Sequence, residues 1–144
     1  MRALVERWFG GIPAGEKVER ELPVPVPLAA EKRVTLEDQV QLPRLYLAWQ
    51  SPREYAKGDA ALDLAGEVLS SGKSARLVKR LVMDERIAQS VMAGQQGMAL
   101  AGTFMVVATP KPGQELRRLE REIDEEIARL AREGPTEAEL QRAK

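Results

Sequence analysis

The amino-acid sequence predicts an α+β fold of two layers, in which helices pack on one face of a mainly antiparallel sheet. Strand-like segments occur in two pairs, and segments with apolar residues at the helical spacing of three or four lie between and after them. The length of 144 residues suits one domain, and 44% hydrophobic with 31% charged residues is ordinary for a globular protein. Because only 4% of the residues are aromatic, we expect a mainly aliphatic core.

The first 28 residues are expected to precede this fold. Residues 1–11 have the pattern of a helix end, stopped by Gly10 and Gly11. In residues 22–28 prolines alternate with leucine and valine, which disfavours a regular ladder and favours an extended linker. A ligand for a proline-binding module is the alternative, but no second anchor in the sequence supports it.

Four strands are predicted, and they cover residues 32–40, 44–50, 87–93 and 103–109. In the first, Val34 and Leu36 alternate with polar neighbours, and Ser51 with Pro52 ends the second. The last is a continuous β-prone apolar run followed by Pro110. Such a run predicts a central strand.

Helices are predicted over residues 59–70, after Ser74, over residues 116–130 and from Thr136 onward. Gly72 lies where the first helix should stop, and Ser74 is placed to cap the second. The apolar residues of the second helix are Leu77, Val78, Leu81 and Val82. Gly134 stops the third helix, and Thr136 with Glu139 forms a capping box that starts a fourth. Because that helix begins just before Lys144, we expect a domain that is truncated at its C-terminus.

The composition excludes several classes of function. The sequence contains no cysteine and no histidine, which removes thiolate chemistry, the most versatile general base and the commonest zinc ligand. Twenty-two basic residues balance 22 acidic ones, so nothing favours binding to nucleic acid or to an anionic membrane. No apolar run approaches the roughly 20 residues that span a bilayer. We therefore expect no metal site, no nucleic-acid partner and no membrane span in this chain.

The tripeptide Gly72-Lys73-Ser74 matches the end of a phosphate-binding loop, but its context does not. That loop needs a first glycine at the position of Glu67, and Gly66 is one residue too early. The preceding segment has a helical pattern where the loop requires a strand, and an acidic side chain would oppose phosphate. The tripeptide therefore predicts a hinge between two helices.

The other candidates for chemistry are weak. An acidic cluster falls on the polar side of the predicted helix 116–130, and it consists of Glu120, Glu122, Asp124, Glu125 and Glu126. We interpret it as a solvated surface with pairs such as Glu125 and Arg129. Lys73 could be a nucleophile only if it were buried. Arg76 and Arg86 could bind a carboxylate, although an ion-pair role is the commoner one for such arginines.

Several stretches together resemble the pitrilysin or insulinase family of zinc metallopeptidases. They are residues 61–91 with the hinge Gly72, Ser74, Arg76 and Leu77, the motif LAWQSP, the run GTFMVVATPKPG and the ending GPTEAELQRAK. The resemblance covers residues 32–144. No single piece is specific, but their order and spacing match the family pattern.

The resemblance implies a protein half made of two similar α+β domains, as in the processing peptidases. The first such domain carries His-x-x-Glu-His with zinc, so a chain without histidine resembles the second, zinc-free domain. Residues 1–28 would then be the tail of the preceding domain with its linker, and residues 29–144 an incomplete second domain. The partner half in this family often supplies an Arg and a Tyr that contact substrate, and the corresponding positions here are Val82 and Gln89.

Two functional hypotheses follow from this resemblance. The first is a non-catalytic chamber-wall domain of a zinc-dependent endopeptidase, which helps to enclose peptides or unfolded proteins and docks the partner half. The second is an inactive scaffold or assembly protein of the same fold. We expect no catalytic, cofactor or metal residue in this chain, zinc in the parent protein, and self-association through an exposed apolar patch.

Overall fold

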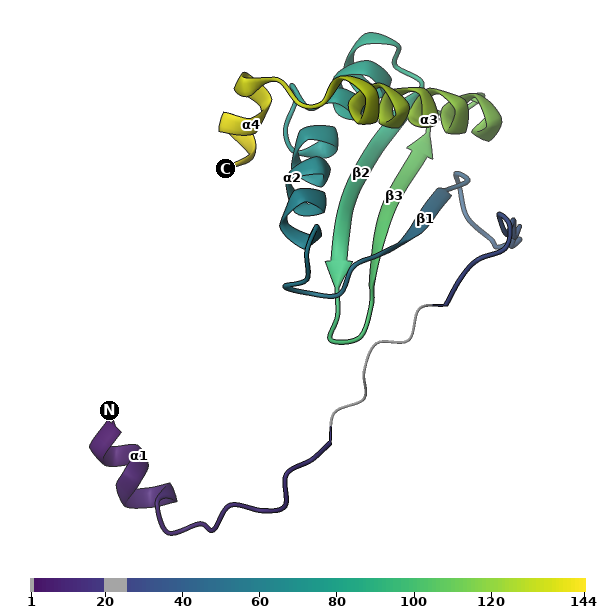
Figure 1. Cartoon of the computed structure of the whole chain (residues 1–144). Helices are drawn as coiled ribbons and strands as arrows, with labels where there is room; N and C mark the ends of the chain where they lie inside the picture. The colour runs from purple at the N-terminus through teal and green to yellow at the C-terminus, as the bar shows by residue number, and fades with distance from the viewer. Residues whose placement is uncertain (1, 20–25) are drawn as a thin grey trace.

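The computed structural model describes residues 2–19 and 26–144 of the chain. Its elements run in the order α1 (Arg2–Phe9), β1 (Leu45–Ser51), α2 (Asp59–Ser70), η1 (Val78–Asp84), β2 (Ala88–Gly97), β3 (Gly102–Pro110), α3 (Leu116–Glu133) and α4 (Glu137–Ala143) (Figure 1). The fold is α+β, with one antiparallel sheet and helices, as the sequence predicts. No helix in residues 2–19 and 26–144 is both long and apolar enough to span a bilayer.

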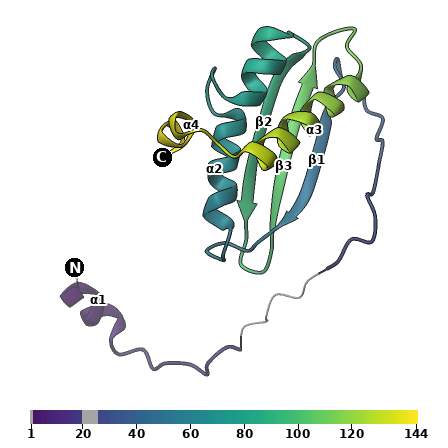
Figure 2. The same cartoon turned by 45° about the horizontal axis from the view of Figure 1, so that its top comes forward.

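The sheet has three strands in the order β1-β3-β2, so β3 is the central strand that its continuous apolar run predicts (Figure 2). β1 pairs with β3 along its whole length, from Leu45 opposite Ala108 to Ser51 opposite Gly102. β2 pairs with the other side of β3, with a register shift between Ala88 and Ser90. β2 extends four residues beyond the predicted end at Ala93, because the neighbouring β3 provides ladder partners as far as Gly102.

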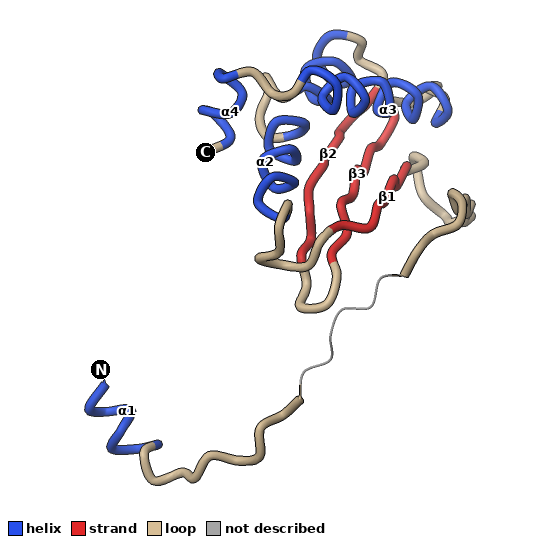
Figure 3. Tube along the Cα trace, in the orientation of Figure 1, coloured by secondary structure: helices blue, strands red, loops and turns tan. Residues whose placement is uncertain are grey.

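One face of the sheet carries the core. Every second residue of β3 is buried, and these are Gly102, Phe104, Val106, Ala108 and Pro110. Ala88 and Val91 of β2 also belong to the buried cluster, and the helices contribute Leu69 from α2, Leu81 from η1, and Leu119 and Ile123 from α3. The buried residues of α3, Leu119 and Ile123, follow the predicted spacing of four, and α2 and α3 lie on the same side of the sheet (Figure 3).

The strand predicted over residues 32–40 is wrong. The segment belongs to no strand, and Val34 and Leu36 are 67% and 87% exposed. A strand needs a neighbour for its backbone groups. Both sides of β3 are taken by β1 and β2, and the segment makes no ladder with β1 among the described residues.

The predicted helix end in residues 1–11 is confirmed, since α1 ends at Phe9 before the two glycines, whereas the assignment of residues 1–28 to a preceding domain and linker stays a prediction. Its apolar residues Leu4, Val5, Trp8 and Phe9 are all more than half exposed. Most of the proline-rich segment, residues 22–25, lies outside the described residues. The fold places the connection between α2 and η1 next to the helices that pack on the sheet.

Candidate functional site

The connection from α2 to η1 is a compact hinge. Gly72 has φ +82°, a left-handed conformation that glycine adopts without strain, and the backbone N–H of Ala75 donates to its carbonyl at 3.2 Å. Lys73 and Ser74 are exposed, whereas Arg76 and Leu77 are buried. The segment before the hinge is helix α2, and a phosphate-binding loop would need a strand there.

The predicted capping role of Ser74 is wrong. Helical structure begins at Arg76, and Leu77 precedes η1 without a side-chain capping bond. The turn that joins Gly72 to Ala75 delays the helix start, which leaves Ser74 in the turn. The four apolar residues of this helix nevertheless face the core, since Leu77 and Leu81 are fully buried while Val78 and Val82 pack against the cluster.

Arg76 joins the hinge to the C-terminal helix. Its Nε and Nη2 donate to the two carboxylate oxygens of Glu139 at 2.8 Å each, and Nη2 also donates to the carbonyl of Gly134 at 2.9 Å. The side chain of Arg76 is only 6% exposed and that of Glu139 15%. Glu139 also closes the capping box of α4 with Thr136, as the sequence predicts. We call the Arg76–Glu139 pair the clasp.

The clasp changes the protonation of both partners. The hydrogen bonds from Arg76 lower the pKa of Glu139 from 4.5 to about 2, against the desolvation that would raise it, and Thr136 adds further hydrogen bonds. The hydrogen bond with Glu139 also raises the pKa of Arg76. The pair is therefore fully ionised at neutral pH.

A second group of charges surrounds Glu126 of α3, which is 0% exposed. Its Oε1 accepts from Arg129 Nη2 at 2.7 Å, its Oε2 lies 3.6 Å from Arg80 Nη1, and Arg76 Nη1 lies 4.0 Å from Oε1. A buried carboxylate is stable only when cations and hydrogen bonds compensate its lost hydration. Glu126 thus links the clasp to η1 and α3.

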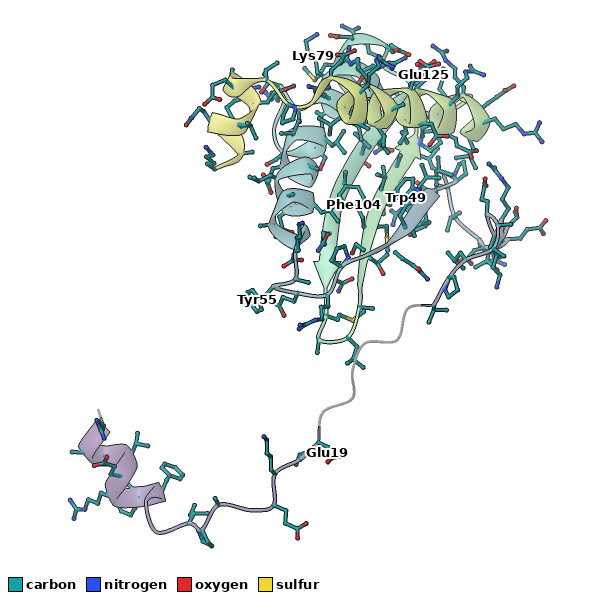
Figure 4. All side chains as sticks on the ribbon, viewed as in Figure 1. Glu19, Trp49, Tyr55, Lys79, Phe104 and Glu125 are labelled. Carbon is teal, nitrogen blue, oxygen red and sulfur yellow. The ribbon has the colours of Figure 1, made fainter. Side chains whose placement is uncertain are left out.

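Arg80 of η1 extends this charged network toward the surface. It donates to Glu85 at 3.0 Å and to Glu125 at 2.7 Å, and it also pairs with Glu122. Its hydrogen bond with Glu125 raises the pKa of Arg80, so the guanidinium stays charged. Lys79 and Glu125 lie on this side of the molecule, where η1 and α3 meet (Figure 4).

The solvated-surface interpretation of the acidic cluster is therefore wrong for Glu126, and the predicted pair of Glu125 with Arg129 does not form. Arg129 pairs with Glu126, and Glu125 pairs with Arg80. The sequence did contain a signal for this burial. Glu126 lies three residues after Ile123 and seven after Leu119, on the same stripe as these core residues.

The positions aligned with the family's Arg and Tyr lie in different environments. Val82 is half-buried within η1, and Gln89 is exposed in β2. Arg86 is exposed beside them in the sequence, and its Nε donates to the carbonyl of Met83 at 3.4 Å. The assignment of Val82 and Gln89 to the substrate-contacting positions stays a prediction.

The hinge and its network form a structural junction. Their members are arginines and carboxylates bonded to one another, together with Thr136, whose hydroxyl donates to Glu139 at 3.0 Å as part of the helix cap. Within residues 2–19 and 26–144 no three acidic side chains are grouped so that they could hold a metal ion. The salt bridges of the junction hold α3, α4 and the hinge in one arrangement.

Residues 1–144 match the family described as the peptidase M16 inactive domain. A curated relative, the zinc protease PqqE of Helicobacter pylori (strain ATCC 700392 / 26695), is 28% identical over 115 residues, which are 80% of this chain and 26% of that protein.

Solved structures show the same fold. A protease from Helicobacter pylori superposes with a TM-score of 0.77 at 25% identity, covering 99% of this chain and 35% of that one. An inactive peptidase domain from Bordetella parapertussis superposes with a TM-score of 0.65 at 24% identity, covering 76% of this chain and 60% of that one. The chain thus spans about a quarter of the curated relative and about a third of the first solved protease. Since the family match covers all 144 residues, the chain belongs to the peptidase M16 inactive-domain family.

Proposed function

We propose that this chain is the non-catalytic chamber-wall domain of a zinc-dependent endopeptidase. The observation that carries the proposal is the match of residues 1–144 to an inactive domain, in a sequence that has no histidine and no cysteine. Without these residues the chain lacks the usual ligands of a catalytic zinc and the usual general base. Zinc and the hydrolytic machinery would then belong to another domain of the parent protein.

The role of such a domain is geometric. Residues 29–144 form the wall, and residues 1–28 act as the tail of a preceding domain and as a linker. The clasp and the buried Glu126 hold the helices against one face of the sheet, which supports the idea of a rigid wall. The wall helps to enclose peptides or unfolded proteins, excludes folded ones and docks the partner half. We also expect self-association of this chain through an exposed apolar patch.

The alternative function is that of an inactive scaffold or assembly protein of the same fold. The residues at the positions aligned with the family's Arg and Tyr are compatible with it, because Val82 has no hydrogen-bond donor and Gln89 lacks a phenol. The same residues are compatible with the second domain of the zinc-bearing half. The gene sequence that precedes this segment separates the two, since an intact His-x-x-Glu-His motif supports the peptidase and an eroded motif supports the scaffold.

A domain exchange tests the proposal directly. In the Helicobacter pylori zinc protease, the region similar to this chain is replaced by residues 29–144, and cleavage of an unstructured peptide is measured with and without a chelator. We expect chelator-sensitive cleavage by the exchanged protein, none by the protease with the region deleted, and none by the 144-residue chain alone. A folded exchanged protein without activity would favour the scaffold, and cleavage by the chain alone would refute both functions.

A further inference from the structure

Residues 26–42 lie against the fold without belonging to a helix or a strand, and we call this segment the strap. It runs past β1 toward the first turns of α3 (Figure 2). Among the described residues its backbone makes one backbone hydrogen bond, a local one from the N–H of Val40 to the carbonyl of Asp38 at 2.9 Å. Hydrogen bonds join the strap to the described part of the fold at two places, and both involve a side chain.

The two contacts attach the strap to different elements. At its start, Gln50 Nε2 of β1 donates to the carbonyl of Val26 at 2.6 Å. Further along, Arg33 Nη1 and Nη2 donate to the two carboxylate oxygens of Glu120 at 3.2 and 2.6 Å. Glu120 belongs to α3 and is 87 residues away in the sequence. The strap is therefore fixed at one point on β1 and at one point on α3.

The contact on α3 is a bidentate ion pair with a mostly covered carboxylate. The side chain of Glu120 is only 16% exposed, whereas that of Arg33 is 68% exposed. The hydrogen bonds from Arg33 lower the pKa of Glu120, against the desolvation that would raise it. Exposed ion pairs contribute little as a rule, but a bidentate arginine–carboxylate pair is the exception because its geometry is fixed. Arg33 and five residues of α3 line one groove, and these are Arg117, Glu120, Arg121, Asp124 and Glu125.

Arg33 is the cation among three carboxylates. Its Nε also pairs with Glu31 of the strap at 2.5 Å. Burial raises the pKa of Asp124 on α3, and the charges of Glu120 and Glu31 raise it further while Arg33 opposes them. Without the guanidinium, the carboxylate of the strap would face two carboxylates of α3, and like charges repel. The position of the strap on α3 thus depends on this one side chain.

We propose that the Arg33–Glu120 pair is a latch that holds the strap on α3 and thereby fixes the place from which the preceding chain leaves the fold. With the latch closed, the chain before Val26 starts from a fixed point beside β1. With the latch open, residues 26–44 lengthen the connection, so whatever precedes it can reach more positions. This inference concerns the strap and α3 alone and does not depend on the chamber-wall role.

Distance measurement between two spin labels by electron paramagnetic resonance tests the latch. The chain contains no cysteine, so Ala30→Cys in the strap and Ala131→Cys on α3, both exposed, give one label at each site. We expect one narrow distance distribution from the labelled 144-residue chain. Arg33→Gln and Glu120→Gln should each lower the ratio of this narrow population to a broad, released one by about fivefold or more. The double variant should lose no more than the more affected single variant, because both substitutions remove the same contact.

The matched control is Lys32→Gln, which removes the same charge from the next residue of the strap, one that pairs with no carboxylate among the described residues. It should keep the narrow distribution. A broad distribution before any charge is changed overturns the proposal, and so does a narrow one that survives Arg33→Gln. Equal loss in Lys32→Gln would assign the effect to the overall charge of the strap, and additive losses in the double variant would exclude a direct contact. Circular dichroism of each variant verifies that the fold itself is kept.

Discussion

The clasp between the hinge and α4 makes a quantitative prediction for Glu139→Gln. The substitution keeps the size of the side chain and an oxygen for the capping box, because glutamine is also accepted at that position. It removes the negative charge that Arg76 contacts through two hydrogen bonds at 2.8 Å. The guanidinium, only 6% exposed, then loses its main counter-charge.

The size of the effect follows from the pKa of Glu139. Its fall from 4.5 to about 2 is a difference of about 2.5 pH units. At about 1.4 kcal/mol per unit this corresponds to about 3 kcal/mol of stability. Because the folded-state pKa is the lower one, this stability is fully present above pH 4.5. It is lost as the pH falls from 4.5 to about 2. Glu139→Gln should therefore lower the free energy of unfolding by about 3 kcal/mol at pH 7 and by much less near pH 2.

Urea unfolding at a series of pH values, followed by circular dichroism, measures this difference. Glu137→Gln is the matched control, since Glu137 is exposed in the same turn of α4, and surface substitutions of this kind change stability by about 0.5 kcal/mol or less. Equal stability of the two variants at pH 7 would refute the reasoning. A gap between Glu139→Gln and wild type that does not narrow in acid would also refute it.

Two further predictions concern the core and the hinge. Leu81→Ala should lower the free energy of unfolding by about 2–5 kcal/mol, because Leu81 is 0% exposed and its truncation leaves a cavity. The control Met83→Ala, at a 47% exposed position, should lower it by less than about 1 kcal/mol. Equal losses for the two variants in urea unfolding would contradict the packing of Leu81 in the core. Gly72→Ala should lower the free energy of unfolding by about 1–2 kcal/mol, because a φ of +82° strains a residue with a side chain. The new Cβ itself would meet no atom within 4 Å, so backbone strain is the expected cause. Gly11→Ala, at a position with equally open space and no positive φ, should leave the melting temperature unchanged, and a similar loss in both variants would exclude backbone strain as the cause.

Local patterns predicted most of the secondary structure because their physical causes are local. The stop at Gly134 and the capping box of Thr136 and Glu139 bound α3 and α4 as expected. Helix α2 covers the predicted residues 59–70. The segment 32–40 had an equally good local pattern, but it forms no strand. A strand needs a neighbouring strand to pair with, and alternation within the segment gives no information about such a neighbour.

The sequence by itself determined the fold class, the central position of β3 and the absence of histidine and cysteine, because periodicity and composition are properties of the chain alone. Only the tertiary structure decided which charges are paired. Arg76 and Glu139 are 63 residues apart, and Arg80 reaches Glu125 across 45. Such partners meet only when the helices pack, and burial then gives their electrostatic contacts a strength that exposed pairs lack. The position of β1 at one end of the three-stranded order likewise became evident only from the pairing of the strands.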